Sequence, residues 1–480
     1  MKKKIWPLLC CALITTVLTA GFPASHVLAT PTDAQTDAAV NQEDGTAENT
    51  TAQPALPESY NWPIQSNETE GWPQGPQVQA ETAIVMEADS GCILYAKGID
   101  ERREPASITK IMTALVALEH SRMDEQVTFS HNAVFSIEQG STHIGIKEGE
   151  VLTMEQCLYG VLLASANEVS NGVAEHVGGS IEEFVDMMNE KAQEIGCKNT
   201  HFSNANGLHN DEHYTTAYDM ALITQAALKN PTFRSIMSTD HFIIPTTNIT
   251  NEERWLNNHH KMLRETKFHY DGCIGGKTGY TTDAGNTLVT VADRNDMELI
   301  CVTLKTNANA VYTDTALLLD YGFNNFQKIA LCQKKQQISV TLLPFDRQFY
   351  PEHASGTIGE YQNDAYAVIP SDIQMENLTK QVSIKENLEE TEYYFNSKLI
   401  TRRLLTLSSV LTSGSPENAV NLLTDTLTDH SDGNIITKFK ALPSWKYPVL
   451  GILGFILVFY IILLILRIKR RKKRRRKRKK

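Results

Sequence analysis

The strongest constraint on this chain of 480 residues is a run of 19 uncharged residues near its C-terminus, Pro448 to Leu466. As a helix, this run would span roughly 28 Å, close to the hydrocarbon thickness of a bilayer. Trp445 and Tyr447 lie where aromatic side chains anchor a span, and 13 of the 14 residues after the run are Lys or Arg. The pattern predicts a transmembrane helix over residues 447–466, followed by a basic cytoplasmic tail over 467–480.

The first 29 residues are typical of a secretory signal peptide. Lys2, Lys3 and Lys4 supply a basic start, an apolar stretch follows, and Val27-Leu28-Ala29 fits a small-residue cleavage site. Because the signal directs export and the basic tail stays inside, we expect residues 30–446 on the outer face of a bacterial cell membrane.

Charge is distributed unevenly along the chain. The formal net charge is −11, but Thr30 to Leu466 holds 29 basic and 56 acidic residues. So acidic an external segment argues against nucleic acid as a partner, because phosphate contacts need a basic surface. The basic tail directly follows the predicted span, which favours contact with anionic lipid.

Six cysteines lie outside the predicted signal. None forms a C-x-x-C pair, so a zinc or thioredoxin-type motif is unsupported. Export permits disulfides, but the sequence cannot choose a pairing, and buried free thiols explain these residues equally well. The six are Cys92, Cys157, Cys197, Cys273, Cys301 and Cys332.

Composition and periodicity divide residues 30–327 into two segments. Residues 30–76 contain no Lys or Arg and are rich in Thr, Ala, Gln, Glu and Pro, so we expect a disordered spacer. In residues 77–327, strand patterns at both ends enclose helical patterns, which predicts one sheet covered by helices. The expected strands are 82–86, 92–95, 287–292 and 298–304, and the expected helices run from 107 to about 229 and over 314–321.

The sequence changes character after this unit. Residues 328–395 contain short alternating runs, which predict a small β-rich domain. Residues 396–446 are expected to form a polar stalk that begins with a helix over Leu399 to Leu411.

Ser107 and Lys110 stand at the start of the helical pattern, just after Pro105-Ala106. The backbone N–H of Ser107 would be one of the unpaired donors of the first helical turn. A serine hydroxyl is a weak nucleophile that needs a base, and Lys110 would lie on the same helix face. Since a desolvated lysine can lose its proton, the pair predicts a nucleophile with its general base.

Ser165-Ala166-Asn167 ends the apolar run Leu158 to Ala164, which indicates a buried turn between helices. The hydroxyl could relay a proton, and the amide could hold a substrate. The same spacing occurs at Ser59-Tyr60-Asn61, inside the spacer, and at Ser130-His131-Asn132, where a helix cap is the better interpretation. Ser165 and Asn167 are therefore the predicted site residues.

Lys277-Thr278-Gly279 follows Gly275-Gly276, and glycine lets another group approach a strand edge closely. A lysine and a threonine hydroxyl there suit a terminal carboxylate, as charge partner and hydrogen-bond donor. Tyr280 would add its backbone N–H to that of Ser107, and the two donors predict an oxyanion hole.

These segments resemble the serine D-alanyl-D-alanine carboxypeptidases, the low-molecular-mass penicillin-binding proteins. The similarity covers about residues 77–323, and it implies an α/β (α+β) penicillin-binding and β-lactamase-like domain in which helices cover an antiparallel sheet. The matching segments are Pro105 to Thr113, Asn206-Gly207-Leu208 with His213 to Ala217, and Lys277 to Thr281 with Ala284-Gly285.

The resemblance also implies a reaction, in which Ser107 attacks the penultimate D-Ala carbonyl of a peptidoglycan stem peptide. D-Ala would leave, water would hydrolyse the acyl-enzyme, and β-lactams would inhibit by acylating the same serine. No metal or cofactor is implied. The implied catalytic residues are Ser107, Lys110 and Ser165, and the implied substrate-binding residues are Asn167, Lys277, Thr278, Gly279 and Tyr280.

Other functions remain open. A D,D-endopeptidase or a transpeptidase would use the same core, whereas a non-catalytic β-lactam sensor or wall-binding scaffold would need no intact nucleophile. His209, Asp211 and His213 could form a small metal cluster, although the middle signature makes them loop residues. A β-lactamase is disfavoured because no E-x-x-L-N stretch supplies a deacylating glutamate, and Glu168 directly follows the Ser165 motif. The G-x-S-x-G elbow of an α/β-hydrolase is absent.

Overall fold

The computed structural model describes residues 56–341 and 355–407. The predicted signal peptide, residues 30–55 of the spacer, residues 408–446 of the stalk, the predicted membrane helix at 447–466 and the basic tail all lie outside the described residues. Within the described ranges, no helix has the length and apolar character needed to cross a membrane.

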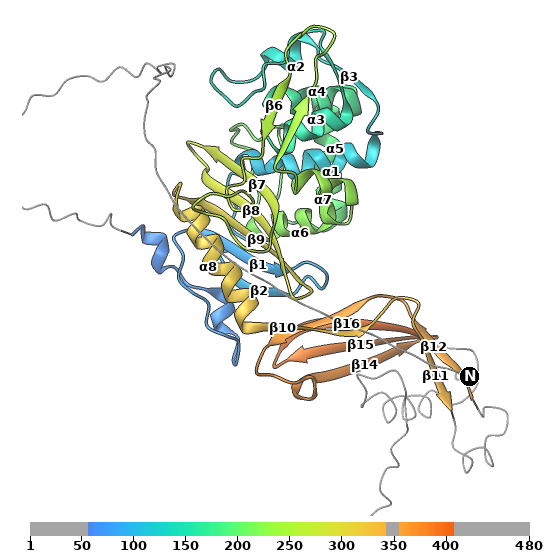
Figure 1. The fold of residues 1–480 in the computed structure, drawn as a ribbon. Helices are drawn as coiled ribbons and strands as arrows, with labels where there is room; N and C mark the ends of the chain where they lie inside the picture. Colours follow the sequence, from blue (N-terminus) through green and yellow to red (C-terminus); the bar gives the residue numbers. More distant parts are fainter. Residues whose placement is uncertain (1–55, 342–354, 408–480) are drawn as a thin grey trace, which may run out of the picture. The chain divides into compact units, whose positions relative to one another are not determined.

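A five-stranded antiparallel sheet lies at the centre of the first domain, with the strand order β2-β1-β9-β8-β7 (Figure 1). Along β1, Ile84 and Met86 join the apolar cluster of α1 and α6, whereas Ala83 and Val85 join the cluster of α8. Both faces of the sheet are therefore buried. The strands are β1 Thr82–Glu87, β2 Ile93–Lys97, β7 Cys273–Thr281, β8 Gly285–Arg294 and β9 Met297–Thr306.

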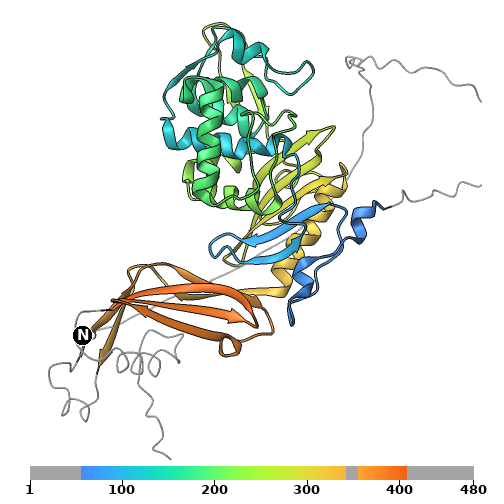
Figure 2. The same ribbon diagram turned by 180° about the vertical axis from the view of Figure 1, so that it is seen from behind.

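Helices cover the two faces of this sheet, as the opposite views in Figure 1 and Figure 2 show. α8 packs on one face, and α6 packs on the other against β1 and β9. The expected sheet covered by helices is confirmed. The helices are α1 Lys110–His120, α2 His131–Phe135, α3 Met154–Leu162, α4 Asn167–Gly178, α5 Ile181–Ile195, α6 Ala217–Leu228, α7 Pro231–Met237 and α8 Ala310–Asn325. Two small two-stranded sheets pair β3 Gln126–Thr128 with β4 Val151–Thr153 and β5 His241–Ile244 with β6 Arg254–Asn257.

Regular structure begins earlier than predicted. Residues 56–76, expected as part of the disordered spacer, contain the short 3-10 helices η1 Glu58–Asn61 and η2 Gln65–Glu68. Trp72 is only 3% exposed, and its indole N–H donates to the Leu94 carbonyl at 2.8 Å. The prediction was wrong for these residues because a few well-packed apolar side chains can hold a segment whose composition favours disorder.

The second domain consists mainly of antiparallel strands. β10 pairs with β13, and the other strands form a sheet with the order β11-β12-β16-β15-β14. β10 begins just before the predicted boundary at 328, and the predicted helix from Leu399 is wrong because these residues form β16. The elements are β10 Phe326–Cys332, β11 Gln337–Thr341, β12 Ser355–Tyr361, β13 Ala365–Pro370, η5 Met375–Asn377, β14 Thr379–Lys385, β15 Leu388–Phe395 and β16 Lys398–Leu407.

The six cysteines of the described ranges are all free thiols. Four are buried, while Cys197 and Cys273 are partly buried. Of the two possibilities that the sequence left open, the structure therefore has free thiols and no disulfide among these six residues.

Candidate active site

Ser107 and Lys110 lie where a 3-10 turn passes into an α-helix. Ser107 belongs to η3 Ala106–Thr109, and Lys110 is the first residue of α1. The Lys110 Nζ is 3.1 Å from the Ser107 Oγ, and it donates to the Asn167 Oδ1 at 2.7 Å and to the Asn206 carbonyl at 2.5 Å. The structure thus brings the predicted nucleophile and its predicted base into direct contact.

The protonation of Lys110 is set by its surroundings. The side chain is fully buried, and this desolvation is the main reason why the pKa of Lys110 lies well below its ordinary value. The positive charge of Lys277 lowers this pKa further, whereas the negative charge of Glu168 raises it. A lysine of this kind can lose its proton and then accept the proton of the Ser107 hydroxyl.

Ser165 occupies the predicted buried turn, between the end of α3 and the start of α4. Its backbone is left-handed, with φ +60°, and the residue is 5% exposed. The Ser165 Oγ accepts a hydrogen bond from the Lys277 Nζ at 3.0 Å. The competing Ser130 caps α2 by accepting from the Ala133 N–H at 2.9 Å, which confirms the cap interpretation.

Lys277, Thr278 and Gly279 lie on β7, the edge strand of the sheet. Burial lowers the pKa of Lys277 to about 7, so its amine changes charge near neutral pH. A Cβ at Gly279 would lie 2.9 Å from the Ser107 backbone N, so this glycine permits the close approach of β7 to the nucleophile. Tyr280 follows with a side chain that is 66% exposed, and its backbone role in an oxyanion hole stays a prediction.

The sequence did not predict a role for two groups near the nucleophile. The Asn206 carbonyl accepts from Lys110, and the Thr109 Oγ donates to the Ala106 carbonyl at 2.8 Å. The first bond holds the Lys110 amine, and the second holds the backbone just before the reacting serine. Asn206 lies 96 residues from Lys110 in the sequence, so only the family-like middle signature pointed to its neighbourhood.

His213 belongs to this hydrogen-bond network. Its Nδ1 accepts from the Ser203 N–H at 2.9 Å, and its Nε2 is 2.8 Å from the Thr109 Oγ. Burial lowers the pKa of His213 to about 3, so the ring is neutral. His209 instead lies 3.5 Å from Asp211, and among residues 56–341 and 355–407 no group of three or more His, Cys, Asp or Glu side chains is placed to hold a metal ion.

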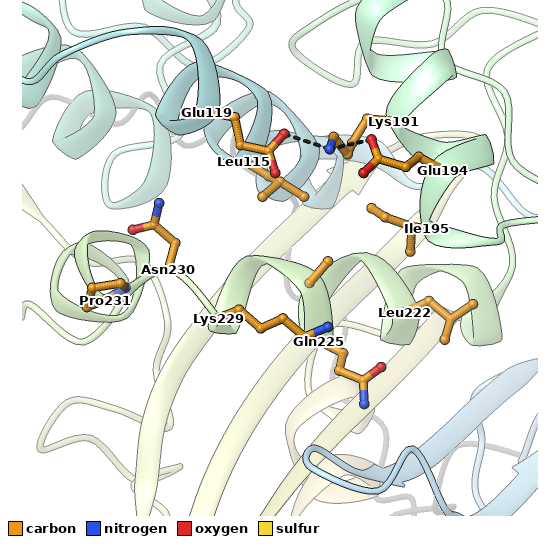
Figure 3. Close-up of a pocket in the computed structure, with 11 residues that line it drawn as sticks. Leu115, Glu119, Lys191, Glu194, Ile195, Leu222, Gln225, Lys229, Asn230 and Pro231 are labelled. Atoms are coloured by element: carbon orange, nitrogen blue, oxygen red, sulfur yellow. Dashed lines mark hydrogen bonds and ion pairs between the residues drawn. The ribbon is translucent and has the colours of Figure 1, made fainter. Parts of the chain in front are cut away.

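A hollow of about 560 Å³ lies elsewhere in the first domain, between α1, α5 and α6 (Figure 3). Lys191 points between two carboxylates there, with its Nζ 2.8 Å from Glu119 and 2.6 Å from Glu194. These carboxylates neutralise the lysine, and no predicted site residue lines this hollow. It therefore plays no part in the geometry around Ser107.

Comparison with known proteins shows that the chain that carries this site is similar to a known family. The D-alanyl-D-alanine carboxypeptidase family matches residues 69–308. D-alanyl-D-alanine carboxypeptidase DacF of Bacillus subtilis is 31% identical over 320 residues, which cover 65% of this chain and 77% of that protein. D-alanyl-D-alanine carboxypeptidase DacA of Haemophilus influenzae is 29% identical over 65% of this chain and 78% of that protein. The crystal structure of penicillin-binding protein 5 from Haemophilus influenzae has a TM-score of 0.59 at 26% identity, over 70% of this chain and 98% of that chain.

Proposed function

This chain belongs to the D-alanyl-D-alanine carboxypeptidase family, and we propose that Ser107, Lys110 and Lys277 carry out its serine-type hydrolysis. The protein is a carboxypeptidase that removes the terminal D-Ala from D-Ala-D-Ala peptides of peptidoglycan. One observation carries the assignment of residues: the Lys110 amine is fully buried and lies 3.1 Å from the Ser107 hydroxyl.

Acylation begins when the Ser107 Oγ attacks the carbonyl carbon of the penultimate D-Ala and the neutral Lys110 Nζ takes the hydroxyl proton. The oxygen of the tetrahedral intermediate gains negative charge, which the backbone N–H groups of Ser107 and Tyr280 would stabilise. When the peptide bond breaks, the proton that Lys110 took passes through the Ser165 hydroxyl to the leaving D-Ala amine, which leaves Lys110 neutral again. The product of this half-reaction is an ester of Ser107.

The terminal carboxylate of the substrate is held by the Lys277 ammonium and the Thr278 hydroxyl, and Gly279 leaves room beside them. Asn167 contributes an amide that can bond the acyl part of the substrate. Water then attacks the Ser107 ester: Lys110 takes a proton from the water and returns it to the Ser107 Oγ as the acyl–oxygen bond breaks. Because a β-lactam presents a similar carbonyl and carboxylate, it would form the same ester.

The test is release of free D-Ala from a pentapeptide that ends in D-Ala-D-Ala, with the Ser107→Ala protein as background control. A labelled penicillin is expected to attach to the peptide that contains Ser107, as read by mass spectrometry. Cleavage of cross-linked dimers without free D-Ala would instead favour the endopeptidase. Absence of both D-Ala release and the penicillin adduct would overturn the proposal and favour a non-catalytic scaffold.

We also propose that the enzyme is a single-pass membrane protein, with residues 447–466 as the span and the catalytic domain outside the cell. The support is the uncharged run and the 13 basic residues that follow it. In cells freed of their wall, an added protease should digest the catalytic domain and spare a tag at the C-terminus. Digestion of that tag would contradict this orientation.

The pH dependence of kcat/KM provides a prediction about Lys277. Its ammonium form binds the substrate carboxylate, and its pKa is lowered to about 7, so free enzyme loses the binding charge as pH rises through 7. We expect kcat/KM to fall above about pH 7, approaching tenfold per pH unit. His259 and His260, which burial gives a pKa of about 4, stay neutral in this range and do not contribute.

The matched variant for this profile is Lys277→Arg. Arginine stays charged up to high pH, so the alkaline decline should disappear from whatever activity this variant retains. A wild-type profile that stays flat from pH 7 to pH 9 would show that the charge of Lys277 does not hold the substrate.

A further inference from the structure

Glu168 is a buried carboxylate that the proposed reaction does not use. It lies in the first turn of α4, directly after Asn167, and is 1% exposed. Its Oε1 accepts from the backbone N–H groups of Ile144 at 2.8 Å and Ile146 at 3.4 Å. Its Oε2 is also buried and has no hydrogen-bond partner within the described part of the chain.

Several other buried carboxylates of the described residues have additional partners. Asp219 accepts from the N–H groups of Lys198 and Asn199 and from the Thr200 hydroxyl. Among the residues that the structure describes, no cation lies within ion-pair distance of Glu168, and burying a negative charge without compensation is strongly unfavourable. Three further carboxylates each form an ion pair: Glu87 with Lys328, Glu150 with Arg254, and Glu389 with Arg403.

The charge of Glu168 acts on Lys110, whose amine donates to the side chain of the adjacent Asn167. Lys110 and Lys277 are 0% and 1% exposed, so two amines share a buried site. The charged groups that act on Lys110 are Lys277 from β7, which lowers its pKa, and Glu168 from α4, which raises it. His213, from the loop before α6, is neutral there. Glu168 is therefore the negative charge that acts on Lys110.

Glu168 also connects the catalytic turn to a neighbouring segment. The Thr142 carbonyl accepts from the Asn167 N–H at 2.9 Å, and the Asn167 side chain accepts from Lys110. On the other side of the segment, Arg254 donates to the carbonyls of Ile144 at 3.0 Å and Gly145 at 3.2 Å. Glu168 thus holds the amides of a segment whose carbonyls are held by Arg254 and by Asn167 itself.

We propose that Glu168 is a positioning residue for acylation: its buried carboxylate supplies the negative charge beside Lys110 and ties residues 144–146 to the turn that carries Asn167. This inference rests on the proposed role of Lys110 as the base. Glu168 acts through Lys110 and Asn167 and does not touch the substrate.

Glu168→Gln separates the charge from the hydrogen bonds, because the glutamine carbonyl can still accept from the Ile144 N–H. Without the negative charge, Lys110 loses the group that favours its ammonium form, so its pKa falls. In full-length protein, the rate of penicillin acylation rises with pH as Lys110 loses its proton. The half-maximal pH of this rising, acidic limb should drop by about one pH unit. The maximal rate should stay within about threefold of the wild type.

Two further variants complete the test. Glu168→Asp keeps the charge but is too short to hold the amides, so the half-maximal pH should stay near that of the wild type while the maximal rate falls about tenfold. Glu150→Gln is the matched control, since it alters a buried glutamate that binds Arg254 on the other side of the segment. It should leave the half-maximal pH unchanged.

An unmoved half-maximal pH in Glu168→Gln would overturn the inference. If that variant does not fold, Glu168→Asp decides, because a shift of its half-maximal pH as large as one unit would also contradict the proposed charge effect. Failure of the wild type to form an adduct at Ser107 would instead refute the proposed function, so the two failures are distinguishable.

Discussion

Lys110→Met is expected to slow acylation by penicillin and release of D-Ala by about 10³-fold. Methionine is of similar length and suits a buried site, but it cannot accept the proton of the Ser107 hydroxyl. The variant loses three hydrogen bonds and also removes a buried amine next to Lys277. Because these changes oppose each other, we expect the free energy of unfolding to change by no more than about 2 kcal/mol.

Lys97→Met is the matched control for this prediction. Lys97 is 1% exposed, its amine donates to the carbonyls of Ser59 and Val78 at 2.7 and 2.8 Å, and burial lowers its pKa to about 8. Its replacement should change thermal stability and leave the acylation rate within about twofold of the wild type. Retention of more than a tenth of the wild-type rate by Lys110→Met would rule out Lys110 as the base.

Gly207→Ala is expected to impair both stability and catalysis. Gly207 has φ +83°, and an added Cβ would lie 2.1 Å from the Ala106 carbonyl oxygen and 3.0 Å from the Ser107 N. The backbone before the nucleophile must therefore move. We expect a loss of about 3 kcal/mol in the free energy of unfolding and a decrease of about 10²-fold in the acylation rate. Thermal unfolding and penicillin acylation measure the two effects.

Gly196→Ala is the control that separates the effect of backbone strain from the effect of a steric clash. Gly196 also has a positive φ, at +98°, but no atom lies within 4 Å of an added Cβ. This variant should lose only about 1 kcal/mol and keep its full acylation rate. Equal effects of the two substitutions would show that the contact between Gly207 and the Ala106–Ser107 peptide is unimportant.

The local parts of the site could be predicted from the sequence, but its long-range parts could not. The spacing of Ser107 and Lys110 follows from one helical turn, and the structure shows their contact. The bond between Lys277 and Ser165 joins residues 112 positions apart, so only family-like motifs indicated that they meet. Glu168 was set aside as a deacylating residue because it directly follows the Ser165 motif. Its burial and its charge effect on Lys110 depend on the fold, which no short motif reveals.

Prediction of the fold from the sequence also fails where long-range contacts decide the structure. The leucines after Leu399 suggested a helix, yet the residues form β16, in which Ile400, Arg403, Leu405 and Leu407 are buried. A charged residue on the buried side hides the alternation that marks a strand. Arg403 is tolerated there because it pairs with Glu389 at 3.1 Å on the adjacent strand β15, a partner that local periodicity cannot identify.

The free thiols have a practical consequence for work with this enzyme. Burial raises the pKa of all six, so each stays protonated near neutral pH, and the four buried thiols are also shielded from alkylating agents in the folded protein. The rate at which such an agent modifies the four buried thiols then reports how often the described domains open. A single cysteine introduced at an exposed position would accept a fluorophore without competition from these four.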